Sequence, residues 1–204
     1  MHNSSMNVHA RIQTFLQQQT VVPLAPPATV VEETYLKAGV VPFVRGQGVI
    51  RYCLMKPVAK RPGLSPPAFQ ICKGTRMRKS DNGWIDMREP SENREGTETL
   101  TTTALREGIE ELGINLEAIT GIFDVGPYRF SSAHTGSDKH MWLYALEMAS
   151  VDELLPMEHV EKSTAERGWL TADEFAVVGR DDHRYILRDI ADKLEKYLHG
   201  HAAR

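Results

Sequence analysis

Residues 98–114, ETLTTTALREGIEELGI, constrain the fold more than any other stretch, because they predict one amphipathic helix crowded with carboxylates. Gly113 is a natural end for this helix. At helical spacing, Glu107, Glu110 and Glu111 are neighbours on one flank and repel each other unless a cation lies among them. Carboxylate oxygens suit Mg²⁺, Mn²⁺ or Ca²⁺. The stretch indicates either a divalent-metal site or a solvated acidic face.

Composition is that of an ordinary soluble protein, with 41% hydrophobic and 25% charged residues in a chain of 204. The net charge of -3 gives no basic footprint, so neither nucleic acid nor a membrane is expected as a partner. No apolar run reaches the roughly 18 residues of a membrane-spanning helix, and the N-terminus lacks an apolar signal-peptide core. We therefore expect a cytoplasmic protein in which Cys53 and Cys72, each in an apolar run, are buried free thiols.

Strand-like and helix-like segments surround the acidic helix. Residues 1–35 are expected to form an N-terminal extension or arm, with a short helix at 10–18 and a proline-containing segment that is a linker or lies along a sheet edge. Strands are predicted at 36–44, 49–56, 69–72, 119–130, 140–147 and 167–170, and further helices at 170–175 and 182–198. This mixed order predicts an α/β sandwich around a mixed sheet.

The segment at 75–97 is long, polar and poorly periodic, and it contains one aromatic residue, Trp84, that is expected to be exposed. A loop of this length inside a compact domain is unusual and tends to be functional or disordered. It could act as a lid or as a dimer contact.

Residues 106–114, REGIEELGI, resemble the signature of the Nudix hydrolase family. That signature runs Gly, five residues, Glu, seven residues, Arg-Glu, an aliphatic residue, any residue, Glu-Glu, any residue, Gly and an aliphatic residue. The matching positions are Glu98, Arg106, Glu107, Glu110, Glu111, Gly113 and Ile114. Two positions depart from it, because Gly108 occupies the aliphatic position and Glu92 stands where the opening glycine belongs.

Lys73-Gly74, after a predicted strand, resembles a displaced start of the signature. Gly74 and Glu98 are 24 positions apart where the family has 6, so 18 extra residues (24 − 6) lie in the loop. The resemblance implies a Nudix-like α/β/α sandwich over residues 36–204, with an inserted loop at about 75–97.

The resemblance also assigns roles in cleaving a pyrophosphate. Glu107, Glu110 and Glu111 would bind Mg²⁺ or Mn²⁺, one of them could act as general base, and the Gly74 carbonyl would add a ligand. Glu98 would hold Arg106, which orients the carboxylates. The physical requirement is the same, since divalent ions clamp phosphate oxygens and acidify a bound water.

A later glutamate often completes the site in this family. The candidates are Glu158, Glu161 and Glu166, with Glu161 preferred, although each alone is typical of a solvated surface. Asp138 and His140 are weaker candidates, and His134 is expected only at the surface.

Substrate contacts are predicted mainly at basic and aromatic side chains. Lys73 fits a phosphate contact, although it also fits a surface lysine at a strand end, and a basic loop around Lys56 and Arg61 is often only solvated. Residues that could stack on a base are Trp84, Tyr128, Phe130 and Trp142, with core packing the alternative for Trp142 and Tyr144.

The leading hypothesis is a metal-dependent hydrolase of the diphosphate linkage in a nucleoside diphosphate linked to another group. Its partner would be a small diphosphate, chiefly a nucleotide, and an arm exchanged between subunits could make a homodimer. The alternative is a non-catalytic Nudix-like domain that binds a nucleotide or a partner protein, motivated by the displaced glycine and Gly108. A diphosphoinositol phosphate is a third option, against which the net charge argues.

Overall fold

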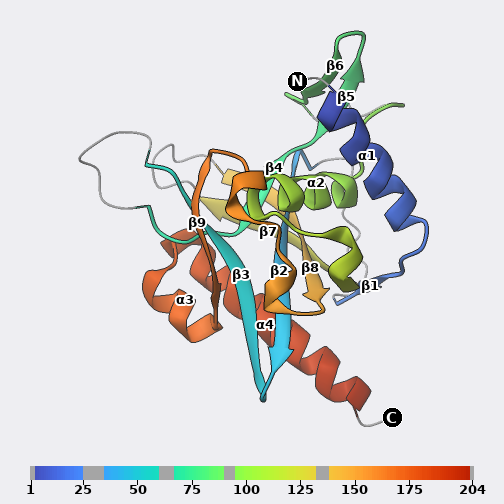
Figure 1. Cartoon of the computed structure of the whole chain (residues 1–204). Coiled ribbons are helices and arrows are strands. Elements are labelled where there is room, and N and C mark those ends of the chain that lie inside the picture. Colours follow the sequence, from blue (N-terminus) through green and yellow to red (C-terminus); the bar gives the residue numbers. More distant parts are fainter. Residues whose placement is uncertain (1–2, 25–34, 60–66, 90–94, 132–137, 203–204) are drawn as a thin grey trace.

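The central strand of the molecule is β2 (Lys37–Gly46), which is buried on both faces along most of its length. The computed structural model describes residues 3–24, 35–59, 67–89, 95–131 and 138–202 (Figure 1). The other strands are β1 (Val21–Pro23), β3 (Val49–Pro57), β4 (Cys72–Thr75), β5 (Met77–Ser80), β6 (Gly83–Asp86), β7 (Ile119–Ser131), β8 (Asp138–Met148) and β9 (Thr164–Leu170). The helices are α1 (Asn3–Leu16), α2 (Leu100–Leu112), α3 (Ala172–Val178) and α4 (Asp181–Ala202), with short 3₁₀ turns at Leu116–Ala118, Val151–Glu153 and Met157–His159.

The main sheet has the strand order β1-β7-β8-β2-β3-β9, and β4 also pairs with β2. The pairs β1–β7 and β2–β8 are parallel, and the other pairs of this sheet are antiparallel. The predicted mixed sheet is therefore confirmed. Its helices cover both faces, with α2 and α1 on one side and α4 with α3 on the other (Figure 1).

Alternation along β2 divides the core between these two faces. Val40 joins the cluster that contains the apolar side of α2, whereas Val41 and Phe43 join the cluster under α3 and α4. Successive side chains of a strand point to opposite faces, so a strand covered on both sides is apolar almost throughout. This explains why residues 38–44, AGVVPFV, contain no polar side chain. Cys53 and Cys72 are buried and unbridged, as predicted.

Helix α2 ends at Gly113, as its sequence predicts. The Thr99 side chain caps the first turn by accepting a hydrogen bond from the Thr102 amide, and Gly113 ends the helix at a φ of 66°. Inside the helix, a Cβ on Gly108 would lie 2.6 Å from Ile114 Cδ1 and 2.9 Å from Val40 Cγ2. The glycine at the aliphatic position of the signature therefore allows close packing against buried side chains.

The N-terminal segment contributes to the core. Helix α1 is longer than the predicted 10–18, its Ile12 is fully buried, and it packs against α2. β1 lies parallel to β7 at the edge of the sheet, which is one of the two arrangements expected for the proline-containing segment. Residues 25–34 lie outside the described residues.

The prediction of a long inserted loop at about 75–97 is wrong for residues 77–86. Residues 77–86 form the β5–β6 hairpin, and β5 is also joined to residues 96–98, with the Lys79 amide donating to the Gly96 carbonyl at 2.9 Å. The hairpin extends from one end of the molecule beside α1 (Figure 1). Its strands bury little surface, so they lack the apolar alternation by which a strand is recognised.

Smaller differences concern element ends. The strand predicted at 69–72 begins only at Cys72, because Phe69 and Gln70 make isolated bridges. No helix in the described part of the chain is long and apolar enough to span a membrane.

Candidate metal and phosphate site

The carboxylates of α2 face the strand β4. A Cβ placed on Gly74 would lie 1.7 Å from Glu107 Oε1, so this carboxylate rests directly on the Gly74 backbone. Any other residue at position 74 would displace it. The displaced glycine of the signature thus lies beside the acidic helix despite the insertion between them.

Arg106 is the centre of the acidic group. Its guanidinium donates to Glu98 Oε1 at 2.8 Å, to Glu107 Oε1 at 2.7 Å and to Glu110 Oε2 at 2.8 Å. It also donates to the Thr75 carbonyl at 2.8 Å, which ties α2 to the end of β4. Only 5% of the Arg106 side chain is exposed, so one buried cation is shared among three carboxylates.

Burial makes these carboxylates electrostatically strained. Desolvation raises the pKa of Glu107 to about 7, against the favourable effect of Arg106, and Glu111 and Glu110 raise it further. Burial likewise raises the pKa of Glu110 and of Glu111 above the usual range. Burial and neighbouring negative charges disfavour the ionised form of these carboxylates. A cation bound among their oxygens would stabilise that form.

The donor set fits a hard divalent cation. Carboxylate oxygens from Glu107, Glu110 and Glu111 and a backbone carbonyl at Gly74 are the oxygen ligands that Mg²⁺ or Mn²⁺ prefers. As arranged, no three Asp, Glu, His or Cys side chains among the described residues converge closely enough to hold a metal. Arg106 donates to one oxygen of each of two of these glutamates, Glu107 Oε1 and Glu110 Oε2.

Glu111 is held from the side of β4. It accepts hydrogen bonds from the Cys72 thiol and the Lys73 amide, both of which lower its pKa against the larger effect of burial. Burial and the nearby guanidinium of Arg180 lower the pKa of Lys73 to about 8. Lys73 therefore lies next to Glu111, and Arg180 lies close to Lys73.

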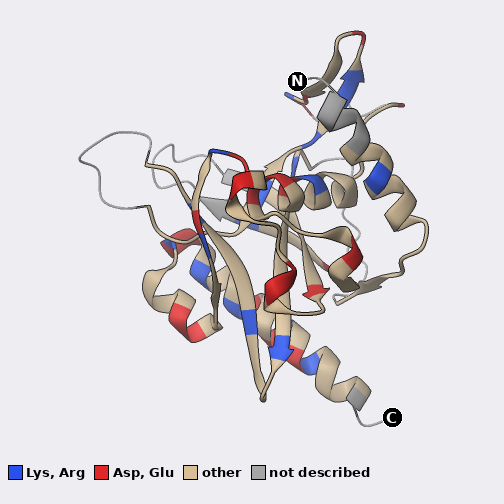
Figure 2. Ribbon diagram, in the orientation of Figure 1, with Lys and Arg blue, Asp and Glu red and all other residues tan. Residues whose placement is uncertain are grey.

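Of the three candidate later glutamates, Glu161 lies beside the acidic helix. Its backbone amide donates to the Glu110 carbonyl at 2.7 Å, and its carboxylate raises the pKa of both Glu110 and Glu111. Glu158 instead pairs with exposed His159. Figure 2 shows acidic positions gathered on the end of α2 that faces the segment before β9.

Two other predicted substrate contacts have partners of their own. Lys56 pairs with Glu166 at 3.0 Å and lies 5.1 Å from the Phe69 ring centroid. The Trp84 ring stacks on His9, with centroids 3.9 Å apart and an interplanar angle of 1°. Arg61 lies outside the described residues, as do Lys60 and His134.

The remaining aromatic candidates belong to the core. The Trp142 indole donates to Asp124 at 2.7 Å, and the Tyr128 hydroxyl donates to Asp189 at 2.6 Å, with both rings buried. Tyr144 is buried as well, as expected for core packing. His140 lies edge-on to Tyr35, and nothing is described for the side chains of Phe130 and Asp138.

Sequence reasoning missed two residues at the start of α4, His183 and Arg180, that bind the residues just before β4. His183 is fully buried, and its Nδ1 accepts the Ile71 amide at 3.0 Å. Arg180 donates to Gln70 at 3.3 Å and pairs with Asp182 at 2.6 Å. The sequence contains a weak signal for them, because residues 180–184, RDDHR, gather basic and acidic side chains at the helix start, but such a run could equally be solvated.

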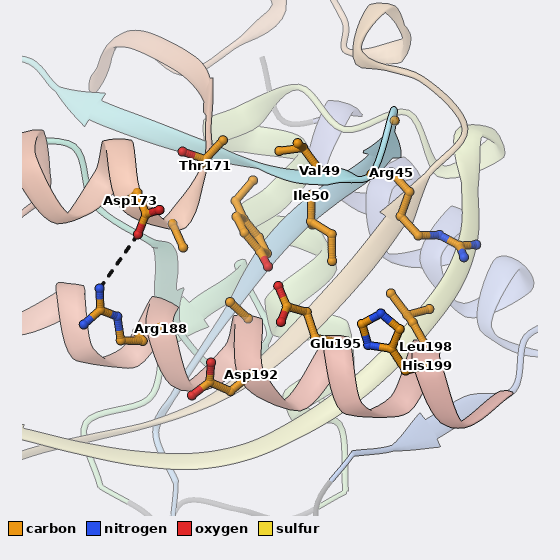
Figure 3. A pocket seen from close by; sticks show the side chains of 15 residues that line it. Arg45, Val49, Ile50, Thr171, Asp173, Arg188, Asp192, Glu195, Leu198 and His199 are labelled. Carbon is orange, nitrogen blue, oxygen red and sulfur yellow. Dashed lines mark ion pairs between the residues drawn. The ribbon is translucent and has the colours of Figure 1, made fainter. Parts of the chain in front are cut away.

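Two pockets are hollowed outside the acidic group. One, of about 400 Å³, is lined by residues that include Gln70, Arg180 and Asp182. The other, of about 670 Å³, lies on the opposite side of the sheet, between the β2–β3 hairpin and α4 (Figure 3). In it, Asp173 and Arg188 pair at 3.8 Å and Glu195 points inward from α4 (Figure 3). The smaller pocket contains Arg180, whose charge acts on Lys73.

Comparison with known proteins agrees with this architecture. The sequence pattern of the NUDIX domain matches residues 72–190. The crystal structure of a C. elegans Ap4A hydrolase in a binary complex is similar, with a TM-score of 0.54, 15% identity, and coverage of 78% of this chain and 97% of that one. A Listeria monocytogenes NUDIX hydrolase has a TM-score of 0.52 and 14% identity over 79% of this chain and 95% of its own.

A third similar structure is the NUDIX domain of Shewanella oneidensis NrtR in complex with ADP ribose, with a TM-score of 0.51, 13% identity, and coverage of 89% and 97%. A search of curated protein sequences finds no match. At these identities the structural likeness establishes the fold. Because the domain pattern spans more than half of the sequence, the chain belongs to the NUDIX family.

Proposed function

We propose that this protein is a divalent-metal-dependent pyrophosphohydrolase that cleaves the diphosphate linkage of a nucleoside diphosphate joined to another group. The observation that carries the proposal is the contact between Glu107 and Gly74, because it rebuilds the two ends of the family signature across an 18-residue insertion. The buried, mutually repelling carboxylates support it further, because a bound cation would relieve their repulsion.

The proposed metal ligands are Glu107, Glu110, Glu111 and the carbonyl of Gly74. A bound Mg²⁺ or Mn²⁺ would neutralise phosphate oxygens and acidify a water. Glu161, with no ion pair among the described residues and with its backbone fixed to α2, is the proposed general base, since a carboxylate there could accept the proton of the attacking water.

Lys73 and Arg180 are proposed to bind the diphosphate. Both are basic, Arg180 lies close enough to lower the pKa of Lys73, and Arg180 lines the smaller pocket. A diphosphate spanning this pocket and the carboxylates would place its anionic oxygens between bound cations and these two side chains. Cationic side chains would also hold the leaving phosphate as its charge develops.

The direct test compares Glu110→Gln with wild type on a panel of Ap4A, ADP-ribose, nucleotide sugars and nucleoside triphosphates in Mg²⁺. We expect turnover of at least one substrate by wild type and a loss of about a hundredfold or more in kcat for the variant. Glu117→Gln, an exposed glutamate outside the site, is the matched control and should retain wild-type rates. Absence of turnover across the panel, or full activity of the Glu110 variant, would refute the proposal.

A second candidate is a NUDIX domain that binds a nucleotide without cleaving it. The specific observation in its favour is that Arg106 engages Glu107 and Glu110, the carboxylates that a metal would need. Titration calorimetry with ADP-ribose decides between the two. Binding that is unchanged by EDTA and yields no product favours the binder, whereas metal-dependent product formation favours the hydrolase.

A further inference from the structure

Two segments outside the family signature meet behind the acidic helix. One is α1, in the N-terminal extension, and the other is the β5–β6 hairpin of the insertion, which lies next to it (Figure 1). Their contact is the stack of His9 on Trp84, almost coplanar at 3.9 Å between ring centroids. We call this pair the His9–Trp84 brace.

The His9–Trp84 brace contacts Glu98 through a hydrogen bond from His9. His9 Nε2 lies 2.7 Å from Glu98 Oε1, and an ionised carboxylate can only accept, so the imidazole donates. The same oxygen accepts from Arg106 Nε at 2.8 Å. A single carboxylate oxygen thus joins α1 to the arginine that holds two of the proposed metal ligands.

The inserted hairpin holds Glu98 from another direction. The Met77 amide donates to Glu98 Oε2 at 2.9 Å, and the Arg76 guanidinium donates to the Glu98 carbonyl at 2.9 Å. Thr103 donates to Oε2 at 2.9 Å from within α2. Both oxygens of Glu98 are therefore oriented by donors from three segments of the chain.

A buried carboxylate keeps its charge only when donors compensate for lost water. Burial alone would raise the pKa of Glu98, but the hydrogen bonds from His9 and Arg106 outweigh it and the pKa is lowered. His9 is therefore one of the groups that keep Glu98 ionised and fixed. Without that donor, the carboxylate would shift toward water or toward another arrangement, and Arg106 would shift with it.

We propose that His9 is a positioning residue, which acts through Glu98 on Arg106 and so sets the placement of Glu107 and Glu110, with Trp84 holding the imidazole in orientation. The N-terminal extension and the insertion thereby become parts of the catalytic architecture. The kinetic part of this proposal rests on the proposed hydrolase function, whereas its structural part does not.

Two complementary substitutions separate hydrogen bonding from packing. His9→Phe keeps a ring that can stack on Trp84 but cannot donate, and His9→Gln keeps a donor near the position of Nε2 but loses the ring. Gln13→Ala, at an exposed position of α1, is the matched control. The first readout is kcat and KM on the best substrate. The second is solvent exchange of the Arg106 Nε–H by ¹⁵N NMR, assigned with Arg106→Lys, which needs neither metal nor turnover.

For His9→Phe we expect kcat to fall about tenfold with KM within about twofold, and Arg106 Nε–H exchange to accelerate about tenfold, as for a lost hydrogen bond to a charged group. His9→Gln and Gln13→Ala should remain within about twofold of wild type on both measures. Wild-type exchange in His9→Phe, or equal defects in His9→Phe and His9→Gln, would overturn the proposal. If wild type turns over no substrate, the exchange measurement alone decides, so loss of the proposed function does not hide the answer.

Discussion

The absence of a side chain at Gly74 determines where the Glu107 carboxylate can lie. The Glu107 carboxylate occupies the space where any Cβ at position 74 would lie, so the two residues define each other's position. Helical spacing explains why Glu107, Glu110 and Glu111 share a flank, and that part of the site is local. Their meeting with Gly74 is not local, because the insertion lies between them in sequence.

Substituting Gly74 by alanine should therefore damage the site more than the fold. The new Cβ would force Glu107 away from β4, and we expect at least a tenfold loss of kcat with a weaker apparent affinity for Mg²⁺, as ligand misplacement costs. The measurement is steady-state activity as a function of Mg²⁺ concentration. Gly46→Ala, where a Cβ meets nothing within 4 Å, is the control. Equal behaviour of the two variants would mean that Glu107 does not depend on this contact.

The spacing of residues in the sequence predicts the acidic group of α2, but it does not predict the residues from distant segments that contact this group. Glu98, Arg106 and Glu107 lie within one helix and its cap, where spacing in sequence translates directly into spacing in space. His9 and Arg180 approach from the two ends of the chain, and only the folded sheet brings them to the site. Nothing in a single sequence measures such distances.

At the scale of elements, β4 is held in place by the start of α4. His183 accepts the Ile71 amide through Nδ1, which requires a neutral imidazole. Burial, followed by the charges of Lys73 and Arg180, lowers the pKa of His183 to about 2. The strand that carries Lys73 and Gly74 is thus fixed by a histidine that resists protonation.

This arrangement predicts an acid-sensitive fold. Since the pKa of His183 is lowered on folding, its contribution is fully present above the unfolded value of about 6.5 and is lost as pH falls toward about 2. The free energy of unfolding should fall by about 1.4 kcal/mol per pH unit below pH 6 from this group alone. His183→Asn keeps an acceptor for the Ile71 amide but cannot titrate, so urea denaturation between pH 7 and 4.5 should show a shallower slope.

His159→Asn supplies the control, because His159 is exposed at the surface and its replacement should leave the pH slope unchanged. If His183→Asn and wild type lose stability in parallel as the pH falls, the buried imidazole is not the source of the acid sensitivity.

Elements differed in how well the sequence predicts them. α2 carries an apolar periodicity and a Gly113 end, and both coincide with the observed helix. The β5–β6 hairpin carries neither periodicity nor burial, since its stability comes from backbone pairing and from its junction with residues 96–98. Its Gly83 turn is a recognisable signal, but the polar strands around it resemble a loop.

At the scale of the whole molecule, the N-terminal segment joins the same core as the family domain. We propose that residues 1–35 remain an extension of a domain at 36–204 in sequence, but one on which that domain depends. The side chain of Ile12 is fully buried in the cluster that also contains Leu105 and Leu112 of α2. A buried anchor of this kind couples the folding of α1 to that of the sheet.

Ile12→Ala should therefore lower the free energy of unfolding of the entire chain by about 2–5 kcal/mol, the usual cost of truncating a buried isoleucine. The loss should appear as one shifted transition, with the same midpoint by circular dichroism and by tryptophan fluorescence, because α1 and the sheet share a core. Gln13→Ala, one residue away and exposed, should change the free energy by no more than about 0.5 kcal/mol. A separate early transition for α1 with an unmoved main transition would show instead that the extension folds independently, and that the domain at 36–204 is stable without it.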